Sequence, residues 1–201
     1  MQATIIAPRN TERTFSDELS VMFSLREHQF FGTTSTTPFA PYVDITFEDS
    51  HHDKRYYLLL VATTTTGIKL GRDWLYDQGF RPGKLKKIMS TMVKKVSDDL
   101  LVEIEQGGCV DEYMRDQLVV FQALAEGQSK VYAGEKDVKL VSQSLHTQTA
   151  QWVAKEIIDV EFDEEGGCVG FGLYPGVDEA NKEGEGEDLA KDLERLDISK
   201  S

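Results

Sequence analysis

Apolar side chains recur every three or four residues in four stretches of the chain, at residues 10–28, 81–108, 111–127 and 146–159. This spacing places apolar groups on one face of a helix and predicts four amphipathic helices. Gly107 follows the second periodic stretch, as is typical of a helix C-terminus. The expected buried positions are Phe15, Leu19, Met22 and Phe23; Leu85, Ile88, Met89, Met92, Val93, Val96, Leu100 and Ile104; Met114, Leu118, Phe121 and Ala125; and Ala150, Val153, Ala154 and Ile157.

Other stretches favour β-strands. In residues 42–49 apolar and polar side chains alternate, which predicts a half-buried strand. Residues 56–62 are continuously apolar, as in a strand that is covered on both faces. Short strands are also expected within residues 129–134 and, around a turn, within residues 159–176. Together these elements predict an α/β (α+β) fold.

The 201 residues carry a net charge of −13. Such acidity excludes a broad basic surface for duplex nucleic acid, so any nucleic-acid contact must be small, such as one chain end held in a pocket. No apolar run approaches the roughly 20 residues that span a bilayer, and we expect no membrane partner. The two cysteines are too far apart in sequence to indicate a metal site or a disulfide framework. The nucleus (nucleoplasm) or the cytoplasm is the expected location.

The last part of the chain differs in composition. Residues 178–201 contain nine acidic and four basic residues and few apolar ones, which is typical of a disordered tail. Leu189, Leu193 and Leu196 have the spacing of a short amphipathic helix. A protein partner that binds this acidic tail is therefore one open alternative.

Tyr113, Asp116 and Gln117 are spaced i, i+3 and i+4 in the third predicted helix, so they share one face. His146 lies in the first turn of the fourth, where backbone N–H groups lack partners and the helix dipole is positive. Such a position attracts phosphate and favours a neutral, nucleophilic imidazole. Asp116 could orient the ring or help to hold a metal ion. The alternative is a partly buried histidine that helps to cap its own helix.

The segment GGCVDEYMRDQLVVFQALAEG, followed by a short strand and by LHTQTA at the head of a helix, closely resembles the RNA 3'-terminal phosphate cyclase family. VATTTTG, a glycine-punctuated loop and a long helix fit that family's order of elements. The resemblance covers about Tyr56 to Ile158, roughly half of the chain.

In that family the histidine of this motif takes AMP from ATP and releases pyrophosphate. AMP then passes to an RNA 3'-phosphate end, and the neighbouring 2'-hydroxyl attacks to give a 2',3'-cyclic phosphate. The resemblance assigns the nucleophile to His146 and the ATP contacts to Tyr113, Asp116, Gln117 and His146. It implies ATP with Mg²⁺ or Mn²⁺, and the catalytic branch rather than the cyclase-like branch that lacks the histidine.

By the same resemblance, residues 76–177 form the last βαβαββ-type repeat of the cyclase fold, with two helices on a mixed sheet. Residues 1–75 would be part of the small inserted domain, and residues 178–201 an acidic tail. The family's N-terminal repeats, which supply further contacts to ATP, metal and RNA, have no match in this sequence. We therefore expect an incomplete nucleotide pocket. Two alternatives are a non-catalytic cyclase-like interaction module in RNA processing or ribosome assembly, and a chain that needs another chain carrying the absent repeats.

Overall fold

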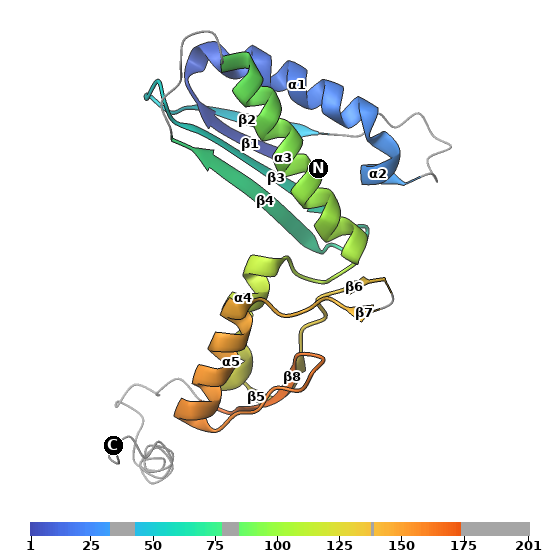
Figure 1. Cartoon of the computed structure of the whole chain (residues 1–201), viewed down its shortest axis with the longest axis vertical. Helices are drawn as coiled ribbons and strands as arrows, with labels where there is room; N and C mark the ends of the chain where they lie inside the picture. Colours follow the sequence, from blue (N-terminus) through green and yellow to red (C-terminus); the bar gives the residue numbers. More distant parts are fainter. Residues whose placement is uncertain (33–42, 78–84, 138, 174–201) are drawn as a thin grey trace, which may run out of the picture. The chain divides into compact units, whose positions relative to one another are not determined.

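The computed structural model describes residues 1–32, 43–77, 85–137 and 139–173 (Figure 1). The chain divides into two compact units. The first comprises Met1–Asp111 with Gly134–Lys136, and the second Glu112–Ala133 with Asp137–Ser201. The predicted division into residues 1–75 and 76–177 refers to the repeats of the family and stays a prediction, and the tail at 178–201 lies outside the described residues.

A mixed four-stranded sheet forms the centre of the first unit, with strand order β2-β1-β3-β4. β1 and β2 are parallel, whereas β3 is antiparallel to both β1 and β4. Parallel neighbours need a crossover connection, and a helix lies in the segment between β1 and β2. The mixed sheet and its helices confirm the predicted α/β class. The strands are β1 (Gln2–Ala7), β2 (Asp44–Asp49), β3 (Tyr56–Thr63) and β4 (Lys69–Tyr76).

Helices α1 (Glu12–Leu25) and α3 (Leu85–Gln106) pack against each other and against one face of this sheet (Figure 1). The 3-10 turn η1 (Arg9–Thr11) precedes α1, and the short α2 (Glu27–Phe31) follows it. Gly107 ends α3 with a left-handed φ of 66°, as the sequence predicted. The helix residues buried in this core are Phe15, Leu19, Met22, Phe23, Met89, Met92, Val93, Val96 and Leu100, and all of them were expected to be buried.

Strand β3 differs from its prediction in one respect. Its residues alternate between buried and half-buried along the strand, with Leu58 and Leu60 fully enclosed and Leu59 and Val61 only half-buried. The expectation of a strand covered on both faces is wrong for the described residues, because the helices of the unit cover a single face of the sheet. The run is continuously apolar in sequence, but only every second side chain of it is fully buried.

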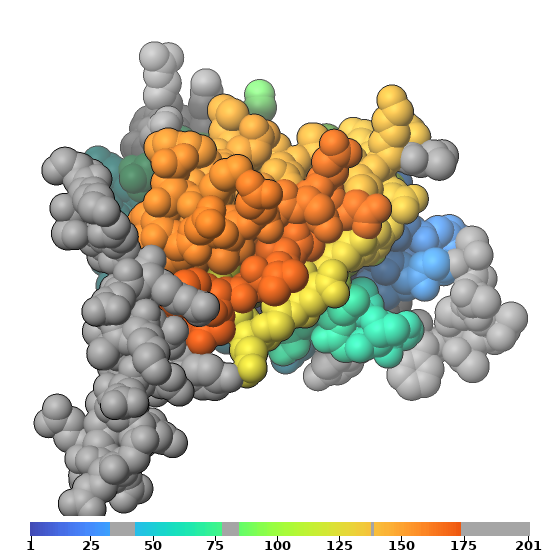
Figure 2. Space-filling model, turned by 90° about the horizontal axis from the view of Figure 1, so that it is seen from below, coloured from blue at the N-terminus to red at the C-terminus, as the bar shows by residue number. Residues whose placement is uncertain are grey.

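The described residues of the second unit form two helices and a two-stranded antiparallel sheet of β5 and β8. Figure 2 shows β5, in yellow, running beside the orange-red segment that contains β8. A two-stranded sheet is marginally stable alone, and here it is supported by helix packing: α4 packs on β8 and on α5. The elements of this unit are α4 (Glu112–Leu124), β5 (Glu126–Lys130), β7 (Lys139–Leu140), α5 (Leu145–Ile158) and β8 (Gly167–Phe171), and β6 (Glu135–Lys136) belongs to the first unit.

Helix α4 buries a different face from the one predicted. Met114 is 43% exposed, Phe121 is 68% exposed and Ala125 is exposed too, so the expected stripe is wrong at these positions, and only its fourth member, Leu118, is half-buried. The apolar pattern was misleading because two long polar side chains find backbone acceptors inside the unit. The residues of α4 that are buried are Arg115, Val119, Gln122 and Ala123.

Helix α5 spans the predicted region, but only part of its predicted inner face is covered. Ala150 and Ala154 are half-buried, as expected. Val153 and Ile157 are 38% and 59% exposed, so their predicted burial is wrong for the described residues. Thr147 takes the innermost position, because its hydroxyl is bonded to α4.

Within the ranges described above, none of the helices combines the length and the apolar character that crossing a membrane requires.

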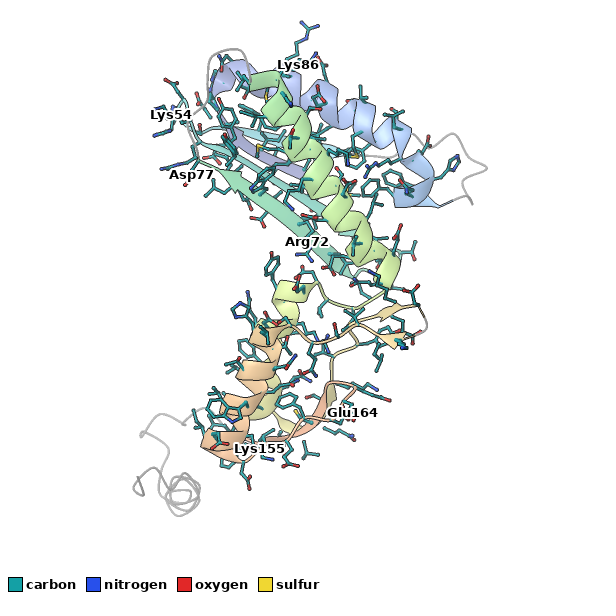
Figure 3. All side chains as sticks on the ribbon, in the orientation of Figure 1. Lys54, Arg72, Asp77, Lys86, Lys155 and Glu164 are labelled. Atoms are coloured by element: carbon teal, nitrogen blue, oxygen red, sulfur yellow. The ribbon has the colours of Figure 1, made fainter. Side chains whose placement is uncertain are left out.

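One ion pair is buried between the sheet and α3. Arg72 of β4, labelled in Figure 3, pairs with Glu103, and their side chains are only 13% and 5% exposed. Replacing one partner would leave the other charge buried, so we expect Glu103→Gln to reduce the free energy of unfolding by about 3 kcal/mol. Urea unfolding followed by Trp74 fluorescence, in a Trp152→Phe background, measures this change.

The exposed pair of Arg13 and Asp17 provides the control, because its side chains are 94% and 74% exposed. Asp17→Asn should change the free energy of unfolding by less than about 1 kcal/mol. Equal effects of Glu103→Gln and Asp17→Asn would contradict the assignment of a structural role to the buried pair.

Candidate active site at the start of helix α5

The predicted nucleophile lies in the first turn of α5. Ser144 caps this helix, and its Oγ accepts a hydrogen bond from the backbone N–H of Thr147 at 3.0 Å. His146 is the second residue of the helix and is exposed. The cap is therefore Ser144, and the alternative of a partly buried histidine that caps its own helix is wrong. In this geometry the N–H groups of Leu145 and His146 have no acceptor within the helix.

Asp116 of α4 binds the two hydroxyls of that first turn. Its Oδ1 accepts a hydrogen bond from Ser144 Oγ at 2.9 Å and another from Thr147 Oγ1. Thr147 is 1% exposed, so the bond from its hydroxyl is shielded from water. Among the described residues, no hydrogen bond joins Asp116 to the imidazole of His146. The structure thus connects Asp116 to the helix that carries His146 rather than to the ring itself.

Arg115, which the sequence did not single out, holds the chain just before α5. Its Nη1 donates to the carbonyl oxygens of Val141 at 3.1 Å and Ser142 at 3.5 Å, and the residue is 9% exposed. Burial lowers the pKa of the guanidinium, while the neighbouring Asp116 opposes that shift. No sequence signal distinguished this arginine from the exposed cations of other helices.

Helices α4 and α5 run parallel, with their N-termini at the same end. Asp116, near the start of α4, contacts the start of α5. Ala123, near the end of α4, shares an apolar cluster with Ala154 and Ile158 at the end of α5. Parallel helices bring together the positive ends of two dipoles, which favours an anion beside His146.

Tyr113 and Gln117 lie on the outer side of α4. Tyr113 is 59% exposed, and Gln117 one turn later is also exposed. The predicted trio is therefore divided: Asp116 turns toward α5, whereas Tyr113 and Gln117 face away from the buried side of α4. Both outer side chains are accessible to a ligand, and their assignment as nucleotide contacts stays a prediction.

The described residues do not form a metal-binding cluster. Within them, no group of three or more His, Cys, Asp or Glu side chains is placed to hold an ion. The carboxylate of Asp116, the predicted candidate, already accepts two hydroxyl hydrogen bonds through Oδ1. These side chains alone therefore do not fit a resident metal ion.

An exposed imidazole in the first turn of a helix is suited to bind and attack a phosphorus atom. Sequence comparison places this site in a known class: the chain belongs to the RNA 3'-terminal phosphate cyclase family, whose sequence model matches residues 12–163. This match confirms the family that the motifs around Asp116 and His146 indicated.

Three relatives match shorter segments. A probable RNA 3'-terminal phosphate cyclase of Dictyostelium discoideum is 44% identical over 61 residues, covering 28% of this chain and 12% of the relative. An RNA 3'-terminal phosphate cyclase of Drosophila melanogaster is 43% identical over 72 residues, covering 32% and 18%. That of Methanosarcina barkeri is 33% identical over 69 residues, covering 34% and 18%. The chain thus matches 12% to 18% of the length of these relatives.

The N-cap of α5 can be tested without any activity assay. We expect Ser144→Ala to destabilise the first turn by about 1 kcal/mol, because one orphan N–H loses its acceptor. Amide hydrogen exchange of Gln148, whose N–H is bonded to Ser144 O at 3.0 Å, should then be faster by roughly fivefold. Ser142→Ala is the control, because the side chain of Ser142 is exposed. Unchanged exchange in Ser144→Ala would argue against the cap.

Proposed function

We propose that the chain takes part in ATP-dependent conversion of an RNA 3'-terminal phosphate to a 2',3'-cyclic phosphate, with His146 as the adenylylated nucleophile. The observation that supports this most strongly is the position of His146. It is exposed in the first turn of a capped helix, and Asp116 holds the hydroxyls on either side of it. Membership of the cyclase family supports the proposed substrate class.

In the first proposed step, a neutral imidazole nitrogen of His146 forms a bond to the α-phosphorus of ATP. The bond from that phosphorus to its bridging oxygen breaks, and pyrophosphate leaves with the electron pair. The other ring nitrogen loses its proton to solvent, which leaves a neutral imidazole phosphoramidate. The N–H groups of Leu145 and His146, with the two helix dipoles, would stabilise the negative charge on the phosphoryl oxygens.

In the following steps, an oxygen of the RNA 3'-phosphate attacks the phosphorus of the bound AMP and displaces the imidazole. The adjacent 2'-hydroxyl then attacks the activated RNA phosphorus and loses its proton, and AMP departs. The product is the 2',3'-cyclic phosphate. Tyr113 and Gln117 are our proposed nucleotide contacts, because both are accessible one turn apart on α4.

A divalent cation, Mg²⁺ or Mn²⁺, would enter with ATP, because Mg²⁺ commonly binds through substrate phosphates and only one or two protein carboxylates. Such an ion would neutralise charge on the phosphates. Among the described residues, no group of three or more His, Cys, Asp or Glu side chains is placed to hold this ion without the nucleotide. The nucleotide pocket needs further residues, because a nucleophile requires its substrate and leaving group to be held in place.

The first chemical step can be tested directly. The chain, incubated with Mg²⁺ and ATP labelled at the α-phosphate, should acquire a protein-bound label that is lost in acid, because a phosphoramidate is acid-labile. Label should not appear with ATP labelled at the γ-phosphate. His146→Asn should abolish the label, whereas His28→Asn, a change at an exposed histidine of the first unit, should retain it. Label that persists in His146→Asn, or its absence from a folded wild-type chain, would contradict the proposal.

A second candidate function is a non-catalytic interaction module. The observation that favours it is the apolar surface of α4 and α5, where Phe121, Trp152 and Ile157 are 68%, 61% and 59% exposed. Exposed apolar groups of this size are typical of interaction surfaces. If this function is correct, a His146→Asn copy should restore RNA processing in cells depleted of the native chain, whereas Trp152→Glu should not. The opposite pattern would favour the enzyme.

A further inference from the structure

Helix α4 holds the segment that leads into α5 at two successive points. Arg115 binds the carbonyl oxygens of Val141 and Ser142, which precede the cap. Asp116 binds the hydroxyls of Ser144 and Thr147, which form the cap and the first turn. Two adjacent residues of one helix therefore fix the course of the chain from residue 141 to residue 147.

Arg115 is buried beside a turn of the same unit. Gly166, with a φ of +83°, forms a turn beside the guanidinium, and a Cβ atom there would lie 3.9 Å from Arg115 Nη2. The side chain of Gln122, one of the buried residues of α4, donates to Gly166 O at 3.2 Å and holds that turn in place. A guanidinium buried in this way keeps its charge and needs acceptors, and consecutive carbonyl oxygens supply them in a fixed direction.

Asp116 makes both of its contacts through a single oxygen atom, because Oδ1 accepts hydrogen bonds from both Ser144 and Thr147. An asparagine side chain presents an acceptor oxygen at this position with two lone pairs, so it could keep both bonds without a negative charge. Asp116→Asn therefore distinguishes two roles of the residue. It should preserve the hydrogen bonds that hold the start of α5, and it should remove the negative charge that a contact to metal or nucleotide would require.

We propose that Arg115 and Asp116 are positioning residues for His146, acting through the backbone before α5 and through its capping hydroxyls. This inference rests on the proposed function of His146. It predicts that loss of either contact slows the chemical step by about 10- to 100-fold, because small displacements of a reacting group reduce its rate strongly. ATP binding should change little, because in this inference Asp116 acts through the start of α5 and not as the ATP contact that the family resemblance implies.

The experiment measures the rate of protein labelling by α-labelled ATP in a single turnover, over a range of ATP concentrations. Arg115→Met, which keeps an unbranched apolar stem but removes every donor, and Asp116→Ala should lower the maximal rate while the half-saturating ATP concentration stays within about twofold. Asp116→Asn should recover most of the wild-type rate, and Thr147→Val should lose part of it. Lys155→Met is the control, because Lys155 lies on α5 and pairs with the exposed Glu161.

Two outcomes would overturn the proposal. If Asp116→Asn were as slow as Asp116→Ala, the charge of the carboxylate and not its acceptor oxygen would be required. If Arg115→Met raised the half-saturating ATP concentration without changing the maximal rate, the arginine would act on nucleotide binding. Circular dichroism and thermal unfolding identify any variant that has lost its fold, and Thr147→Val then provides an independent test of the same contact.

An activity-independent measurement separates this inference from the proposed function. Amide hydrogen exchange at Thr147 and Gln148 should be faster in Arg115→Met and Asp116→Ala, near wild type in Asp116→Asn, and unchanged in Lys155→Met. A wild-type chain that shows this exchange pattern but never becomes labelled would refute the function while keeping the positioning contacts. A labelled chain whose α5 start exchanges at the same rate in every variant would refute the positioning role alone.

Discussion

The bonds from Ser144 and Thr147 to the carboxylate of Asp116 are the interaction on which the candidate site depends. The first turn of a helix is less stable than its middle, because its backbone N–H groups have no partners within the helix. Here a side chain from a second helix holds both hydroxyls of the cap. The direction of α5, and with it the place of His146, is therefore set by α4.

The same contacts explain the charge distribution around the site. The carboxylate of Asp116 is directed at hydroxyl groups, and Arg115 is directed at backbone carbonyl oxygens. Each of these two charges thus has hydrogen-bond partners inside the unit, and the N–H groups of Leu145 and His146 have no acceptor within α5. An acidic protein with a net charge of −13 can in this way present a small anion-binding point without a basic surface.

The two units differ in how completely their apolar side chains are buried. In the first, the helices and one face of a four-stranded sheet share a continuous core that includes Phe15, Leu58 and Met92. In the second, the core is small, and large apolar groups such as Phe121 and Trp152 remain exposed on the helices.

The sequence by itself determined the longer helices, strands β2 and β3 of the central sheet, the family and the candidate nucleophile. It did not predict β1 and β4, the other two strands of that sheet. Periodicity was reliable for α1 and α3 because apolar side chains make up most of their buried faces, with Ser97 and Glu103 of α3 as the polar exceptions. It failed for α4, where Arg115 and Gln122 are buried and Met114 and Phe121 are not. The buried face of such a helix depends on which polar groups find acceptors. Only the tertiary structure decided this, because the acceptors at Val141, Ser142 and Gly166 lie about 20 to 50 residues away along the chain.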